Sequence, residues 1–367
     1  MAHLNPGMQR LAVMFLLIAC CSAHPAFASG AMIPDDVRDA VRSLVDTGEH
    51  VGIAVGLVTP AGTEFFCYGH QSLSRERPIS ERTLFEVGSV GMTFTASLLA
   101  ALALRGDVAL TDPVRRYLPE TVTLPTRFGR EITLEHLATH TSGLPSIPEN
   151  LDPADWDNPY ADYTVDQMYE FLSSLDTVRI GEYEYSNLAM GLLGHVLALH
   201  AGMSYEELIV ETLGIPLGLP DTCSTLTLDQ QNRTATGHNE DGAYPRWDIP
   251  TLAGAGALLS TAADLTRFVA AHLGLVETPL ANALQMTHAV RVPGAMPVGL
   301  GWHMRITNDK TIVEHHGATG GNWSYVGFVT DEGRGVVVLA NTYANIDSIG
   351  IHLIDANVPL DIAGATP

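Results

Sequence analysis

The residues best suited to chemistry lie at the start of a long predicted helix. Ser89 stands between Gly88 and Val90, directly after the apolar segment Leu84–Val87, and a proline-free segment follows as far as Arg105. A serine hydroxyl is a weak nucleophile at neutral pH, and helix N-terminal N–H groups can stabilise the oxyanion of acyl transfer. Serine is also an ordinary helix cap, so this segment alone leaves a catalytic and a structural interpretation open.

Further short motifs follow Ser89 along the chain. Tyr185-Ser186-Asn187 precedes a predicted helix, and His315-His316-Gly317 lies in a predicted strand. Taken alone, Tyr185 and Asn187 suit a hydrophobic contact and a cap at the start of that helix. Four other segments enter the comparison of motifs below: Asp112-Pro113-Val114, Ile132–Pro145, Ala253–Phe268 and Gly299–Trp302.

Together these segments resemble, in content and order, the motifs of the class C β-lactamase family and its relatives. The relatives include low-molecular-weight penicillin-binding proteins, D-aminopeptidases and family VIII esterases. The resemblance covers about residues 34–360. It implies an α+β, β-lactamase/transpeptidase-like fold and a serine hydrolase that forms an acyl-enzyme, without a metal or another cofactor.

The resemblance also implies roles for single residues. Ser89 is the expected nucleophile and Tyr185 its expected catalytic neighbour. The N–H groups of Ser89 and Ala318 are expected to form the oxyanion hole. The expected substrate-binding residues are Asn187, His315, Gly317 and Ala318.

One catalytic position departs from the family pattern. The first family motif is S-x-x-K, and Met92 stands where its lysine belongs. Positions i and i+3 share a helix face, which in the family lets the lysine amine take the serine proton. A thioether accepts no proton, and loss of a general base costs about 10²–10⁴ in rate. We therefore expect a Ser89 site that is impaired or repurposed. Tyr185 would replace the base if its pKa were depressed, with His315 the nearest group to lower it.

The histidine pattern does not indicate a metal site. Adjacent strand residues such as His315 and His316 point to opposite faces, so they do not chelate together. His136 and His140 have the spacing of H-E-x-x-H, but Leu137 stands at the glutamate position, which favours a structural role. The H-x-G form in place of K-T-G removes a fixed ammonium, so the preference shifts from β-lactams towards esters or D-amino-acid peptides.

Two functional classes therefore stay open. The first is an exported serine hydrolase acting on an amide or ester: a β-lactam, a D-amino-acid peptide or a small ester. The second is a non-catalytic relative that binds cell-wall peptide or β-lactam-like ligands in an inactive cleft. Labelling of Ser89 by a fluorophosphonate or a penicillin probe distinguishes the two.

The predicted elements place the sheet at the two ends of the chain and the helices between them. This order favours an antiparallel sheet formed from both termini and flanked by helices, with an inserted, mainly helical subdomain over roughly residues 90–270. The predicted strands form two hairpins, Val51–Val58 with Thr63–Tyr68 and Ser324–Thr330 with Gly335–Ala340. The predicted helices are Pro34–Gly48, Ser89–Arg105, Leu188–Ala201 and Thr261–Leu273. Pro145–Thr164, acidic without a basic residue, is either a solvated loop or a lid over a site.

Composition excludes several partners. The 367 residues carry 41 Asp+Glu against 19 Lys+Arg, a formal net charge of −22, which argues against nucleic acid and anionic membrane surfaces. A small-molecule or peptide substrate fits better. Lys310 is the only lysine of the chain and lies near a predicted strand turn. Nothing in the sequence sets an oligomeric state.

The N-terminus is typical of a targeting segment. Arg10, the apolar run Leu11–Ala23 and Ala26-Phe27-Ala28 predict a signal peptide over residues 1–28 and one domain over residues 29–367. We expect a periplasmic or secreted product without a transmembrane span after signal cleavage. The alternative is a lipoprotein anchored at Cys20. Of the cysteines after the leader, Cys67 and Cys223, the first is expected to be a buried free thiol.

Overall fold

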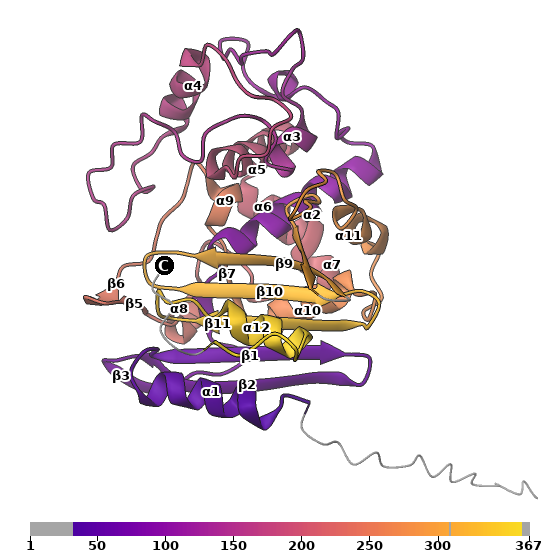
Figure 1. The fold of residues 1–367 in the computed structure, drawn as a ribbon. Coiled ribbons are helices and arrows are strands. Elements are labelled where there is room, and N and C mark those ends of the chain that lie inside the picture. Colours follow the sequence, from indigo (N-terminus) through magenta and orange to yellow (C-terminus); the bar gives the residue numbers. More distant parts are fainter. Residues whose placement is uncertain (1–31, 308–309, 362–367) are drawn as a thin grey trace, which may run out of the picture. The chain divides into compact units, whose positions relative to one another are not determined.

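A seven-stranded antiparallel sheet carries the fold, in the order β3-β2-β1-β11-β10-β9-β8 (Figure 1). The computed structural model describes residues 32–307 and 310–361, so the predicted leader lies outside the described residues. The strands of this sheet are β1 (Gly52–Thr59), β2 (Gly62–Ser72), β3 (Arg75–Pro78), β8 (His303–Thr307), β9 (Lys310–Ala318), β10 (Trp323–Val329) and β11 (Arg334–Ala340).

The two ends of the chain meet in the middle of this sheet. Strand β1 pairs with β11 from Ile53 opposite Ala340 to Val58 opposite Gly335. The N-terminal hairpin β1–β2 and the C-terminal hairpin β10–β11 thus become neighbours, as the sequence predicts. The predicted α+β class, with an antiparallel sheet formed from both termini, is confirmed.

Side chains of the central strands point alternately to the two faces of the sheet, so the apolar core forms two layers, one on each face. In β11, Val336 and Val338 pack with apolar residues of α1 (Asp35–Asp46) and α12 (Asp347–Ile354). Val337 and Leu339 face the opposite way and join the larger core with α10 (Ala262–His272). Successive side chains of a strand point to opposite faces, so these valine-rich strands are buried on both sides. Figure 1 shows α1 and α12 on the same face of the sheet.

The segment between β3 and β8 is mainly helical. It also holds two short two-stranded sheets, β4–β7 and β5–β6. Its strands are β4 (Leu84–Glu86), β5 (Gly237–Asn239), β6 (Gly242–Tyr244) and β7 (Leu259–Thr261). Besides α10, its helices and helical turns are η1 (Gly88–Val90), α2 (Gly91–Arg105), η2 (Val114–Tyr117), α3 (Leu134–Ala138), α4 (Val165–Ser174), α5 (Asn187–Ala201), α6 (Tyr205–Ile209), η3 (Val210–Gly214), α7 (Ile215–Leu217), α8 (Leu228–Arg233), α9 (Ala253–Gly256) and α11 (Ala281–Thr287).

Helix α2 runs through the centre of the larger core. Its residues from Gly91 to Leu102 are all buried, so it is apolar around its whole circumference. Gly88–Arg105 is long and apolar enough to cross a membrane, but most of it is buried inside the protein, as in a core helix. Gly106 ends α2 with a φ of 82°, a left-handed conformation that glycine adopts without strain.

The cysteines agree in part with the prediction. Cys67 and Cys223 are both free, and burial raises the pKa of each thiol to about 12. Cys223 is buried, whereas Cys67 on β2 keeps partial exposure. The expectation of a free thiol at Cys67 is confirmed. Its expected burial is only partial, because β2 lies near the edge of the sheet.

Candidate active site

The turn that carries Ser89 is pressed against the end of β9. Ser89 is half-buried in the 3-10 turn Gly88–Val90, between β4 and α2. Gly88 has a φ of 49°, and a Cβ built on it would lie 2.7 Å from the carbonyl oxygen of Ala318. Only glycine fits both the left-handed conformation and this approach.

On β9, a second glycine, Gly317, lets the strand come close to the Ser89 turn. A Cβ on Gly317 would lie 2.2 Å from the carbonyl oxygen of Val87 and 2.7 Å from the amide nitrogen of Ser89. The hydroxyl of Ser324 donates a hydrogen bond of 2.7 Å to the Val87 carbonyl and fastens the two segments together. The backbone of Ser89 and the end of β9 therefore lie side by side.

The predicted oxyanion residues line one small cavity of about 40 Å³. Ser89, Asn187 and Ala318 line it, together with Tyr160 and Trp247. Ser89 lies at the start of a helix, where backbone N–H groups lack intrahelical partners. The cavity is therefore lined both by the expected nucleophile and by the residues whose N–H groups are expected to hold the oxyanion.

Met92 lies one turn after Ser89 and is completely buried. The hydroxyl of Tyr185 donates a hydrogen bond to the Met92 sulfur across 3.3 Å. Burial raises the pKa of Tyr185 well above its usual value, although a hydrogen bond with Ser89 acts in the opposite direction. Tyr185 is therefore a neutral phenol at neutral pH.

His315 on β9 does not supply a positive charge. It is buried, and its Nδ1–H donates a hydrogen bond of 2.6 Å to the carbonyl of His316. Its Nε2 has no partner among the residues that the structure describes. Burial lowers the pKa of His315 well below its usual value, so the ring is neutral. The condition under which Tyr185 would replace the base, a pKa depressed by His315, is therefore not met.

Two more imidazoles complete an aromatic cluster around Tyr185. His140 stacks on Tyr185 with ring centroids 4.6 Å apart, and its Nδ1 accepts a hydrogen bond from the Ser186 amide. The ring centroids of His303 and His315 lie 5.2 Å apart, and the Nε2 of His303 forms a hydrogen bond with the hydroxyl of Tyr183. Burial lowers the pKa of His140 to about 3 and that of His303 to about 4. Sequence reasoning missed His303, although it directly follows the Gly299–Trp302 motif.

Asn187 is placed at the cavity and does not cap its helix. Ser186 is the cap of α5, and its Oγ accepts a hydrogen bond of 2.9 Å from the Ala189 amide. Asn187 is the first helical residue and hydrogen-bonds Tyr160. The structural alternative that makes Asn187 the cap is wrong, because the preceding serine already fills that position.

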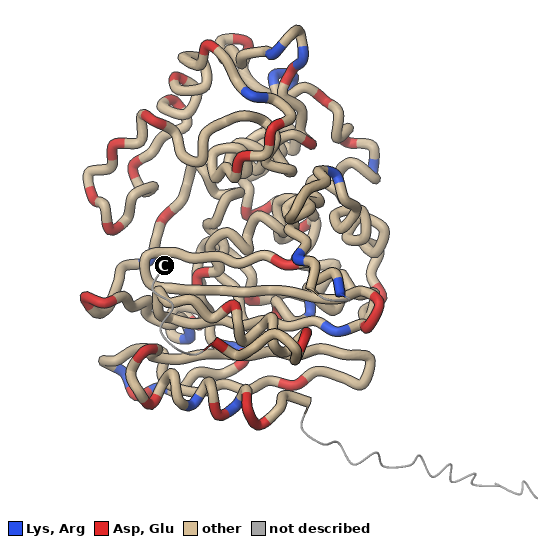
Figure 2. Tube along the Cα trace, viewed as in Figure 1, with Lys and Arg blue, Asp and Glu red and all other residues tan. Residues whose placement is uncertain are grey.

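The acidic segment Pro145–Thr164 contributes one residue, Tyr160, to the wall of this cavity. Tyr160 lines it and meets Trp247 edge to face, with ring centroids 5.7 Å apart. The carbonyl of Asp157 accepts a hydrogen bond of 3.0 Å from the Trp247 indole. Figure 2 shows acidic residues along this segment without basic ones. These contacts favour a lid over a freely solvated loop.

Glu86 is a buried carboxyl that sequence reasoning missed. It accepts hydrogen bonds from the amide of Trp247 (2.8 Å) and from the side chains of Asn322 (2.7 Å) and Thr319 (3.3 Å). Burial raises its pKa to about 7. Glu86 thus connects the strand before Ser89 to the loop after β9 and to Trp247, whose indole in turn contacts the acidic segment. It is a positioning residue, because it does not line the cavity.

Comparisons with known proteins agree with this arrangement. The family model described as Beta-lactamase matches residues 37–351. A beta-lactamase of Pseudomonas fluorescens is 30% identical over 355 residues, covering 86% of this chain and 96% of that protein. The D-alanyl-D-alanine-carboxypeptidase/endopeptidase AmpH of Escherichia coli K12 is 30% identical over 335 residues, covering 86% and 84%.

Solved structures extend the likeness to the fold. The beta-lactamase/D-alanine carboxypeptidase from Pseudomonas syringae superposes with a TM-score of 0.78 at 26% identity, over 90% of this chain and all of that one. The chain belongs to the beta-lactamase family. The predicted resemblance to β-lactamase and penicillin-binding-protein-like serine hydrolases is thereby confirmed.

Proposed function

We propose that this chain forms an acyl-enzyme on Ser89 with amide or ester substrates, and that Met92 limits the rate of that step. The Ser89 oxygen attacks the substrate carbonyl, the amine or alcohol leaves with a proton, and water then releases the acyl group. The cavity shared by Ser89, Asn187 and Ala318 supports the binding part of this proposal. The N–H groups of Ser89 and Ala318 are suited to hold the oxyanion.

The hydrogen-bonded path from Ser89 through Tyr185 to Met92 carries the second part. It ends on a thioether sulfur, which accepts a weak hydrogen bond but no proton. The proton released by Ser89 therefore has no strong base along this path. The unprotonated Nε2 of the neutral His315 supplies a weak base at best, because burial keeps its pKa low. Slow acylation with preserved binding follows from this arrangement.

The substrate class follows from the missing ammonium groups. Met92 and His315 stand where the family motifs carry lysines. Lys310, the first residue of β9, forms an ion pair with Glu332 in the turn between β10 and β11. No fixed ammonium therefore pairs with a substrate carboxylate at Ser89. We favour small esters and D-amino-acid peptides over β-lactams. The relatives named above include both a beta-lactamase and a D-alanyl-D-alanine carboxypeptidase.

A labelling experiment tests the proposal. The purified protein is incubated with a fluorophosphonate and, separately, with a fluorescent penicillin, and the modified residue is found by peptide mass spectrometry. We expect a slow covalent adduct on Ser89 that disappears in Ser89→Ala. A folded protein that takes no label but binds a D-alanyl-D-alanine peptide would instead favour the non-catalytic relative, for which Met92 is the supporting observation.

Export is the remaining part of the proposal. We propose that residues 1–28 form a cleaved signal peptide and that the product is periplasmic or secreted. The charged start, the apolar run and the A-x-A sequence support it. N-terminal sequencing of the processed protein tests it, with Ser29 as the expected first residue. A lipid-modified Cys20 as first residue would establish the lipoprotein alternative.

A further inference from the structure

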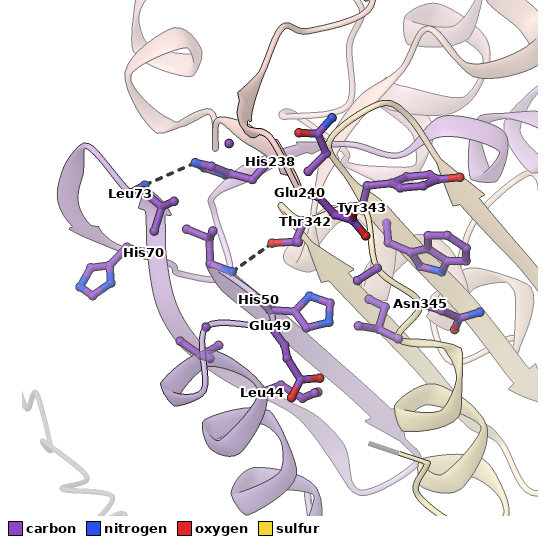
Figure 3. Close-up of a pocket in the computed structure, with 18 of the residues that line it drawn as sticks. Leu44, Glu49, His50, His70, Leu73, His238, Glu240, Thr342, Tyr343 and Asn345 are labelled. Carbon is purple, nitrogen blue, oxygen red and sulfur yellow. Dashed lines mark hydrogen bonds between the residues drawn. The ribbon is translucent and has the colours of Figure 1, made fainter. Parts of the chain in front are cut away.

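A second and much larger cavity, of about 960 Å³, lies at one end of the main sheet (Figure 3). Its walls come from the C-terminal end of α1, the β5–β6 hairpin and the loop between β11 and α12. It shares no lining residue with the cavity at Ser89. Its volume is in the range of cavities that bind small molecules.

The charges on this wall have one sign. Glu49, Glu76, Glu240 and Asp241 line the cavity, and no lysine or arginine lines it within residues 32–307 and 310–361. An acidic wall raises the local concentration of cations and repels anions. The occupant that suits this wall is therefore positively charged.

A buried histidine with an unpaired nitrogen forms part of the wall of the same cavity. His50 is only 3% exposed, and its Nδ1 has no hydrogen-bond partner among the described residues. Figure 3 shows its ring directed from the end of α1 towards Asn345. Burial lowers the pKa of His50 to about 4, so the ring is a neutral imidazole. A buried polar atom without a partner is costly, and a bound N–H donor would relieve that cost.

Two aromatic rings form a further part of the wall. Trp323 and Tyr343 line the cavity with their ring centroids 5.8 Å apart. Aromatic faces attract organic cations and the alkyl segments between their charges. In contrast, no three histidine, cysteine or carboxylate groups of the described chain come close enough together to hold a metal ion. Figure 3 shows Glu49 and Glu240 at separate places on the wall, which suits a long cation with separated charges.

We propose that this cavity binds an aliphatic polyamine, with separate ammonium groups paired to Glu49 and Glu240 and one N–H directed at His50. The aromatic pair would cover the intervening methylene groups. This site is additional to the proposed hydrolase function and does not depend on Ser89. The proposal can therefore succeed or fail independently of acylation.

Isothermal titration calorimetry with spermidine at 150 mM sodium chloride tests the proposal on the full chain. We expect one bound spermidine per chain and at least about tenfold weaker binding in Glu49→Gln/Glu240→Gln. The matched control is Glu120→Gln/Glu170→Gln, which removes two exposed carboxylates elsewhere and should change the dissociation constant less than about twofold. If both double variants lost the same affinity for spermidine, the binding would be a general attraction to an acidic protein, and the proposal would be overturned.

A second variant separates the histidine contact from overall charge. His50→Phe keeps an aromatic ring but removes the nitrogen, so we expect at least about fivefold weaker spermidine binding. Thermal unfolding should show no loss of stability, because an unsatisfied polar atom is removed. Titration with magnesium chloride should show no site. Tight magnesium binding, several spermidines per chain, or unchanged spermidine binding in His50→Phe would each contradict the proposal.

Discussion

The phenol of Tyr185 donates its hydrogen bond to the sulfur of Met92 across 3.3 Å. The two residues are 93 positions apart in the chain and meet beside Ser89 in the core. A lysine amine at the same place could receive a proton, whereas the sulfur only accepts a weak hydrogen bond. The limit that we propose on turnover therefore lies at the side chain of residue 92.

Met92→Lys should raise the turnover of a p-nitrophenyl ester or of nitrocefin by at least about a hundredfold. The new amine would be buried, and burial lowers a lysine pKa towards the range in which it accepts a proton. Steady-state kinetics measure the effect. Met92→Leu is the control, since it keeps an apolar side chain and should leave turnover unchanged. A folded Met92→Lys protein without a gain would show that Met92 does not limit the reaction.

Tyr185→Phe should have a background-dependent effect. In the natural chain the Tyr185 proton path ends on sulfur, so we expect acylation of Ser89 to slow by less than about tenfold. In the Met92→Lys chain the same change should cost about 10²–10⁴, because the phenol then connects Ser89 to a base. The coupling is read from a double-mutant cycle on acylation rates. Equal losses in both backgrounds would mean that Tyr185 does not act through position 92.

The sequence contains most of the information that sets the sheet. Alternating or continuous runs of apolar β-branched residues in Val51–Val58 and Gly335–Ala340 predict strands, and both are found within one or two residues of the predicted bounds. Helix ends are predicted equally well where glycine follows, as at Gly106 and Gly202, because both adopt left-handed conformations. These features depend on neighbours along the chain.

The missed features depend on long-range contacts. Glu86 and Asn322 are 236 positions apart, and neither has a local pattern that indicates a shared buried network. The ring of His303 meets those of His140 and Tyr185 only in the folded chain. The resemblance identifies individual positions such as Ser89. Whether an imidazole there is charged depends on its burial, which the sequence alone does not give.

Glu86→Gln should change how stability depends on pH. Burial raises the folded-state pKa of Glu86 from 4.5 to about 7, so the folded protein holds a proton that the unfolded chain releases. The stabilising contribution is complete below about pH 4.5 and is lost as the pH rises to about 7, in total on the order of 3 kcal/mol. Glutamine resembles the protonated form and does not titrate. In thermal melts at pH 5–8, the melting temperature of Glu86→Gln should rise relative to that of the natural protein as the pH increases. Melting temperatures that change with pH in parallel for the two proteins would contradict this.

The buried pair His272 and His288 should produce the opposite pH dependence. The Nδ1 of His272 and the Nε2 of His288 lie 2.6 Å apart. Burial lowers the pKa of His288 to about 4 and that of His272 well below its usual value. Both rings are neutral in the fold, so their contribution is present above pH 6.5 and is lost as the pH falls towards 4. His288→Leu should reduce this acid sensitivity in melts between pH 7.5 and 4.5. The surface variant His70→Leu should melt like the natural protein at each pH. If the His288→Leu variant were as sensitive to acid as the natural protein, this pair could not be the source of that sensitivity.

Gly317→Ala tests whether the contact between β9 and the Ser89 turn is required for acylation. The added Cβ would lie 2.2 Å from the Val87 carbonyl and 2.7 Å from the Ser89 nitrogen, so one of the two backbones must move. Overpacking of this kind costs about 1–3 kcal/mol and would displace the N–H groups expected to hold the oxyanion. We expect fluorophosphonate labelling of Ser89 to slow by at least about a hundredfold. Gly294→Ala is the matched control, because a Cβ there meets nothing within 4 Å. If a folded Gly317→Ala protein were labelled at an unchanged rate, the reactivity of Ser89 would not depend on the position of β9.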